Sequence, residues 1–224
     1  MIKFMLFLCM LPLTNEFCEA KKVTGYIITE NSDTLYGEIK VPNFNRITGG
    51  WIMSGTNLES FHFEVSFKNR QKNTFQTFKP EDILGFGFNY KSINYTFRRF
   101  VIVSKNFFKK ERRIVRFLNL EYSGKVALYE DVIRVNNNNM KTNTTDITKG
   151  DSYVYYDYYL FNDSIGLKKV ELTDDIKSLV DLLKLYGFEK DFLDSIPKKT
   201  NLKDIKMILM EYDTWCTKKP SAKE

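Results

Sequence analysis

Alternating apolar and polar positions, the pattern of half-buried β-strands, recur from residue 23 to residue 172. The clearest example is 23–41, in which two β-rich runs flank the polar cluster 30–33 (Glu-Asn-Ser-Asp). Asn, Ser and Asp favour turns because their side chains hydrogen-bond nearby backbone groups. We therefore predict an antiparallel hairpin with one buried side. Its second strand is expected to bury Leu35, Gly37, Ile39 and Val41 and to carry Tyr36, Glu38 and Lys40 on the other face.

Further runs predict strands at 61–67, 73–78, 95–103, 114–120, 125–135, 152–161 and 167–172, with a short strand around Trp51. In 61–67 the aromatic and aliphatic residues are expected to face inward, which makes His62 a surface histidine. Val101 and Val103, on either side of Ile102, suggest that this strand is buried on both faces. Residues 79–83 suggest a single helical turn, because Pro80 suits a first helical position.

From residue 173 the apolar period changes from 2 to 3.6 residues, which predicts helices. One helix face is marked by Ile176, Leu179, Val180, Leu183 and Tyr186, with Gly187 at its C-terminal end. A second is marked by Leu202, Ile205, Ile208, Leu209 and Tyr212, with Asn201 as its N-cap. The short segment 188–196 links them. Apolar stripes this wide need cover, so we expect the helices to pack on the sheet or on a partner.

These patterns predict an α+β protein: an antiparallel β meander, either a sheet or a partly closed barrel or sandwich, followed by a C-terminal helical segment. We expect the β domain to span 21–172, with a mobile loop at 136–150 because that stretch is polar and aperiodic. The helices should occupy 173–216, and 217–224 should be a tail.

The first twenty residues have the features of a secretion signal. Lys3 precedes the apolar run 4–13, and Cys18-Glu19-Ala20 ends in a small residue. The run is too short for a transmembrane helix, which needs about 20 apolar residues. We expect cleavage after Ala20 and export, with the protein periplasmic or associated with the outer membrane. The alternative is that Cys18 is lipidated.

Composition narrows the picture. A hydrophobic content of 43% with 28% charged residues is typical of a folded domain, and 15% aromatics suit pleated surfaces. Of three cysteines, only Cys216 lies beyond the signal, so no internal disulfide is expected. We interpret Cys216 as packed on a C-terminal helix; the alternative is a disulfide between chains.

Catalytic motifs are sparse. His62 is the only histidine, so any His-based metal or nucleophilic site would have to include it. Gly85-Phe86-Gly87 lacks the later glycine and the helix start of a phosphate-binding loop. The adjacent acids Glu81 and Asp82 point apart. We therefore expect no cofactor and no metal, and a protein that is not an enzyme.

Two clusters are candidates for binding a ligand or partner. The first is a basic run with interleaved phenylalanines: Lys105, Lys109, Lys110, Arg112, Arg113 and Arg116. It suits phosphate or sulfate groups, or alternatively protects a hairpin edge by charge. The second is a tyrosine-rich strand: Tyr153, Tyr155, Tyr156, Tyr158 and Tyr159. Tyrosines on both faces suit a carbohydrate or protein surface, or alternatively sheet packing.

Four short motifs carry a resemblance: Gly25-Tyr26-Ile27-Ile28-Thr29, Asp33-Thr34 followed by Gly37, Pro80 to Phe86, and Tyr212-Asp213-Thr214-Trp215-Cys216. With these, the chain resembles a group of uncharacterised exported proteins of the Bacteroidetes type. The resemblance implies location in a Gram-negative envelope and implies no activity.

The sequence thus predicts a non-enzymatic binding or assembly component of the Gram-negative cell envelope. We expect an envelope protein partner or an anionic glycan or glycolipid, no nucleic acid, because the protein is exported, and no transmembrane helix. One alternative is an envelope hydrolase that uses carboxylates only. The other is an integral outer-membrane β-barrel, against which the helical C-terminus argues.

Overall fold

The computed structural model describes residues 20–42, 44–45, 50–51, 59–105, 111–136, 152–171, 176–197 and 204–218. Ten strands form one antiparallel sheet in the order β12-β11-β10-β9-β8-β7-β1-β2-β5-β6. They are β1 (Lys21–Thr29), β2 (Thr34–Val41), β5 (Val65–Asn69), β6 (Gln76–Phe78), β7 (Ile83–Tyr90), β8 (Ile93–Lys105), β9 (Glu111–Tyr122), β10 (Ala127–Asn136), β11 (Ser152–Asn162) and β12 (Gly166–Lys169). Strands β3 (Phe44–Asn45) and β4 (Gly50–Trp51) pair separately.

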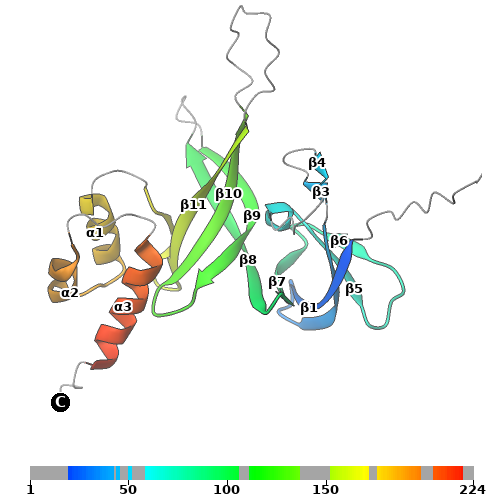
Figure 1. Cartoon of the computed structure of the whole chain (residues 1–224), viewed down its shortest axis with the longest axis horizontal. Helices are drawn as coiled ribbons and strands as arrows, with labels where there is room; N and C mark the ends of the chain where they lie inside the picture. Colours follow the sequence, from blue (N-terminus) through cyan, green and yellow to red (C-terminus); the bar gives the residue numbers. More distant parts are fainter. Residues whose placement is uncertain are drawn as a thin grey trace, which may run out of the picture.

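The predicted α+β class and antiparallel meander are confirmed. Consecutive strands pair from β7 to β12, and the chain joins its first hairpin to this series by pairing β1 with β7. The sheet is strongly coiled, with β1, β2, β5 and β6 at one end of the molecule and three helices at the other (Figure 1). Strands β8 and β9 run between the two ends.

The opening hairpin forms as predicted. Strands β1 and β2 are in register from Lys21–Val41 to Ile28–Thr34. In the turn between them the Ser32 N–H donates to the Thr29 carbonyl at 2.9 Å, and Ser32 has a positive φ of 66°. Ile39 and Val41 are buried, whereas Leu35, at the turn end of the strand, remains exposed.

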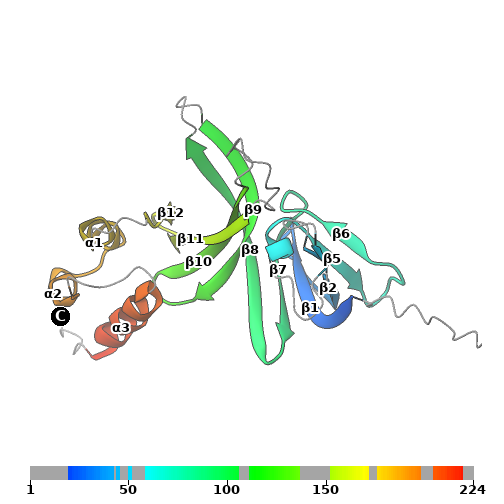
Figure 2. The same cartoon turned by 45° about the horizontal axis from the view of Figure 1, so that its top comes forward.

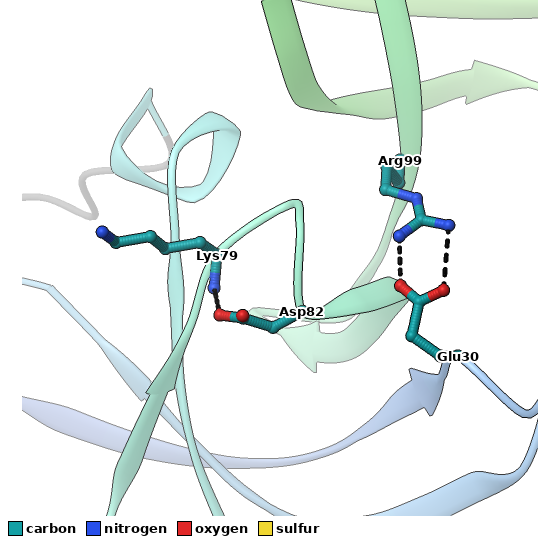
Figure 3. A network of polar contacts seen from close by, with 4 residues as sticks. All are labelled: Glu30, Lys79, Asp82 and Arg99. Atoms are coloured by element: carbon teal, nitrogen blue, oxygen red, sulfur yellow. Dashed lines mark hydrogen bonds and ion pairs between the residues drawn. The ribbon is translucent and has the colours of Figure 1, made fainter.

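An ion pair ties the tip of this hairpin to the middle of the sheet. Glu30, in the turn, accepts two hydrogen bonds from the guanidinium of Arg99 on β8 (Figure 3). The same figure shows Asp82, whose carboxylate accepts the backbone N–H of Lys79 at 2.8 Å. Residues 80–82 form a hydrogen-bonded turn, so the predicted helical turn is wrong: β7 begins at Ile83, immediately after that turn.

Three apolar clusters hold the sheet. At the β1–β2 end, one face carries Ile27, Ile39, Phe67, Phe86 and Phe97 around Phe61. We call this side the inner face and the opposite side the outer face. At the other end the inner face continues with Leu128 and Leu160, and the helices cover it. A third cluster of Phe100, Leu118, Tyr129 and Tyr159 lies on the outer face of the central strands.

The helices are α1 (Ile176–Leu185), α2 (Lys190–Ser195) and α3 (Ile205–Lys218). Gly187 ends α1 with φ of 81°, where its N–H and that of Phe188 donate to the carbonyls of Lys184 and Leu183. Tyr186 fastens α1 to the sheet, since its hydroxyl donates to the Leu160 and Gly166 carbonyls at 2.6 and 2.8 Å. Among the described helices, none combines the length and the apolar character needed to cross a membrane.

The stretch 61–67 differs from its predicted strand. Residues Glu59–His62 form a 3-10 helix, η1, and the strand β5 starts only at Val65. His62 is therefore buried, with 2% of its surface exposed, and the expectation of a surface histidine is wrong. Val101 and Val103 are more than half exposed, so β8 is not buried on both faces at this end. Ile102, between these two valines and on the opposite face, packs against the third apolar cluster.

Several predictions fall outside the described residues. They are the signal segment up to residue 19, residues 137–150 of the expected loop 136–150, the Asn201 cap, and the expected tail 217–224 from residue 219 onward. Asn136 is the last residue of β10, and α3 extends to Lys218, two residues into the expected tail.

Candidate functional site

The predicted basic run does not form one surface within the described part of the chain. Arg112 and Arg113 are exposed on β9 and, as neighbours on a strand, point to opposite faces. Arg116 is half-buried, and its guanidinium carbon lies 4.5 Å from the centre of the Phe63 ring. Lys105 ends β8, and Lys109 and Lys110 lie outside the described residues.

The predicted tyrosine cluster is also divided. Tyr159 is buried in the outer-face cluster, Tyr158 is half-buried, and Tyr156 is 42% exposed. Tyr153 and Tyr155 lie in β11, paired with Val135 and Ile133 of β10. Of the three whose side chains are described, only Tyr156 is therefore available to a ligand.

Arg116 belongs to a buried polar cluster instead. The Asp131 carboxylate lies 3.3 Å from His62 Nδ1 and 3.7 Å from Arg116 Nη1. Asp131 and His62 are almost fully buried, and none of these three atoms has a hydrogen bond of good geometry to a described group. The cluster links η1 to β9 and β10 through the carboxylate of Asp131.

This cluster sits where the sheet divides. Strands β9 and β10 pair only from Tyr122–Leu128 to Asn119–Glu130. Beyond that point β9 stays with β8 and β10 stays with β11, and the two ribbons separate (Figure 2). Because η1 packs against both β9 and β10, His62 bridges the fork.

Two carboxyl groups come together on the inner face beside the fork. Glu130 lies opposite Asn119 on β9 and Tyr158 on β11. Burial, and next the nearby charge of Glu121, raise the pKa of Glu130 to about 7. Glu121 accepts a hydrogen bond from Asn119 Nδ2 at 2.7 Å and pairs with Lys206 of α3.

A hollow lies elsewhere, on the outer face of the opening hairpin. One row of residues crosses four strands there: Tyr36 on β2 faces Tyr26 on β1, Tyr26 faces Gly87 on β7, and Gly87 faces Thr96 on β8. Beside that row, Asn89 faces Asn94 and their side chains share a hydrogen bond of 2.7 Å. Together with Thr24 these residues line a cavity of about 390 Å³, which we call the tyrosine groove.

The groove depends on a missing side chain. A Cβ atom at Gly87 would lie 2.6 Å from the hydroxyl oxygen of Tyr26, so only glycine lets that ring lie flat across β7. Tyr36 is 60% exposed, and its ring centroid lies 6.2 Å from that of Tyr26 at an angle of 57°. The groove thus has an aromatic wall, a glycine floor and amides at its other side.

A second hollow adjoins the groove and shares Thr24 with it. This cationic hollow, of about 300 Å³, is lined by Thr24, Gly37, Glu38, Lys68, Arg70, Lys72 and Asn73. Lys68 forms an ion pair of 2.7 Å with Glu38, and this hydrogen bond lowers the pKa of Glu38 below its usual value. Lys72 donates to the neutral side chain of Gln76 at 3.2 Å. Arg70 is exposed and has no ion pair with another described residue.

Nothing in the sequence marked these two hollows as a site, although part of the signal was present. The alternation on β2 correctly separated Tyr36 and Glu38 from the buried positions. What alternation does not give is the register, which places Tyr26 between Tyr36 and Gly87. The cations at 68–72 lie between the predicted strands 61–67 and 73–78, and their spacing carries no motif.

Comparisons with protein-family models, with curated proteins and with solved structures found no significant match. No group of three or more His, Cys, Asp or Glu residues in the described ranges is placed to hold a metal ion. The candidate site therefore rests on the geometry of this chain.

Proposed function

We propose that this protein is a binding component of a Gram-negative cell envelope and that the tyrosine groove holds a sugar ring of an envelope glycan. The observation that carries the proposal is the row of Tyr36, Tyr26 and Gly87 on a sheet face that no described element covers. Export is the expectation drawn from the apolar segment that precedes Lys21.

The chemistry of the groove matches what a sugar offers. A pyranose ring has an apolar face of C–H groups, which packs against an aromatic ring, and a rim of hydroxyls that both donate and accept hydrogen bonds. Asn89 and Asn94 provide amides, which also donate and accept, and Thr24 and Thr96 provide hydroxyls. A pocket with an apolar wall and a few convergent polar groups is the usual form of a small-ligand site.

The experiment is calorimetric titration of the purified protein with oligosaccharides released from Gram-negative envelopes. We expect Tyr36→Ala to weaken binding about tenfold, the effect of losing one stacking ring. Tyr156→Ala is the matched control, because Tyr156 is another exposed tyrosine outside the groove. If both variants bind like the parent protein, or if only a protein partner binds, the glycan proposal is wrong.

The expected location is tested separately. Protein recovered from the envelope fraction of the native cell should begin at Lys21 by N-terminal sequencing. A chain that retains its first residues and stays in the cytosol would contradict the envelope assignment.

A second candidate function is hydrolysis by carboxylates, and one observation favours it. Glu130, with a pKa of about 7, has the protonation behaviour of a general acid–base, and Glu121 is close enough to raise that pKa. Release of reducing ends from envelope oligosaccharides, abolished by Glu130→Gln and retained by Glu171→Gln, would support it. No release by the parent protein would exclude this activity on these substrates.

A further inference from the structure

The cationic hollow bears on which glycans the protein prefers, because it lies beside the tyrosine groove. The hollow and the groove lie on the same face of the sheet, because Lys68 faces Glu38 on β2 and Glu38 faces Thr24 on β1. This row is two residues along β2 from the row that contains Tyr36. Two residues of a strand span about 7 Å. The two hollows are therefore spaced on the scale of neighbouring units of one chain-like ligand.

The charges of the hollow are unevenly balanced. Among the described residues that line it, Glu38 is the only carboxylate, and Lys68 already pairs with it at 2.7 Å. Arg70 and Lys72 keep their positive charges without a carboxylate partner among the described residues. Both belong to the short connection between β5 and β6, so they project beside the groove instead of into the core.

We infer that the cationic hollow binds an acidic substituent, a carboxylate, sulfate or phosphate, carried by the sugar next to the one in the tyrosine groove. This inference rests on the proposed function and adds selectivity for acidic over neutral glycans. Arg70 supplies a planar fork that matches such an anion in a bidentate manner, and Lys72 adds a point charge. Asn73 and Thr24 offer uncharged hydrogen-bonding groups at the rim.

The test compares two probes with the same sugar backbone: an oligogalacturonate and its methyl ester, in which esterification removes the negative charges. The parent protein should bind the acid about tenfold more tightly, the effect of one charge-assisted pair. The Arg70→Ala/Lys72→Ala variant should bind both probes equally, at the affinity of the ester. Arg113→Ala removes one charge from an exposed arginine on β9, outside the hollow, and should keep the tenfold preference.

The outcomes separate the two ideas. Equal binding of acid and ester by the parent protein, with loss of both in Tyr36→Ala, would overturn the acidic subsite and leave glycan binding intact. A preference that Arg113→Ala removes as well would also overturn it, because net charge would then be the cause.

If neither oligomer binds, the proposed function fails on these probes and the hollow is tested alone. Sodium sulfate is then titrated while the side-chain NMR signals of the arginines are followed. Saturable shifts of Arg70 that exceed those of Arg113 would support an anion site, and equal shifts would overturn it. Binding only to phosphatidylglycerol vesicles, removed by Arg70→Ala/Lys72→Ala, would assign the anion to a lipid headgroup and overturn the acidic glycan.

Discussion

The two ends of the sheet bury their inner faces in different ways. At the helix end, α1 and α3 cover Leu128 and Leu160, and the cover consists of residues far along the chain. At the hairpin end no described helix longer than η1 takes part: the coiled strands fold phenylalanines onto one another, with Phe61 of η1 at the centre. The outer face at the hairpin end has no described element over it, and that is where the tyrosine groove and the cationic hollow lie.

The comparison teaches that the covered apolar faces and the proposed binding surface lie in different parts of this fold. Aromatic residues at the helix end are buried in the core. Tyr186 donates a hydrogen bond to the sheet, and the rings of Phe188 and Tyr212 stack with their centroids 3.8 Å apart. At the hairpin end, Tyr26 and Tyr36 lie on the face that packing does not use.

The largest effect is expected at the junction between the two ends. Asp131→Ala would leave the guanidinium of Arg116 and the ring of His62 without their shared carboxylate in a buried site. We expect a loss of about 3 kcal/mol in the free energy of unfolding, measured by chemical denaturation. Glu30→Ala is the control, since its ion pair with Arg99 is half exposed and should contribute less than about 1 kcal/mol. Equal losses in both variants would show that burial of the cluster is unimportant.

Glu130 gives the next effect, which depends on pH. Its pKa is about 7 in the folded protein and 4.5 in its ordinary state, so the folded chain binds the extra proton between these values. The contribution of Glu130 to the free energy of unfolding is therefore fully present below pH 4.5, and it is lost as the pH rises through 7. We expect Glu130→Gln to be more stable than the parent by about 1–2 kcal/mol at pH 8, a value reduced for partial exposure, and equal to it at pH 4.

The control is Glu171→Gln, which changes an exposed carboxyl near the end of β12. It should show no such pH-dependent difference. A Glu130→Gln variant less stable than the parent at pH 8 would contradict the claim that the charged form of Glu130 is destabilised by burial.

A smaller effect is expected where α3 meets the sheet. The hydroxyl of Tyr122 on β9 donates to Asp213 of α3 at 2.6 Å, and this bond raises the pKa of Tyr122 to about 12. Tyr122→Phe should cost about 1 kcal/mol in thermal or chemical unfolding. Tyr36→Phe, which removes an exposed hydroxyl, should leave the free energy of unfolding unchanged. A loss as large as that of Tyr122→Phe would mean that the hydrogen bond to Asp213 is not the cause of the effect.

The smallest effect on stability is expected in the tyrosine groove itself. Gly87→Ala should displace the ring of Tyr26, the movable end of a side chain, and change stability by less than about 1 kcal/mol. It should nevertheless abolish glycan binding. Gly166→Ala is the reverse case: its φ of 79° makes alanine strained by about 1 kcal/mol, yet it lies outside the groove. Unchanged binding in Gly87→Ala would remove Tyr26 from the site.

Local patterns predicted the strands and helices because each reports the burial of its own residues. The opening hairpin, the tyrosine-rich strand and the end of α1 at Gly187 are examples. Local patterns failed at His62, where an alternating run forms a 3-10 helix. The side chains of this helix fill the fork between β9 and β10, which lie far from it in the sequence. The same limit hid the groove: the sheet order places β7 beside β1, and no local period encodes that pairing.

The short pairing between β9 and β10 has a consequence for how the molecule opens. The ladder that stops at Asn119–Glu130 is the shortest between any two of the long strands, those of eight or more residues, in the sheet. In hydrogen exchange, the amides of β1, β2 and β7 should become labelled as one cooperative unit and those of β10, β11 and α1 as another. The molecule would then behave as two folding units joined by the buried cluster of His62, Arg116 and Asp131. The strength of that junction would determine how strongly a structural change in one unit is transmitted to the other.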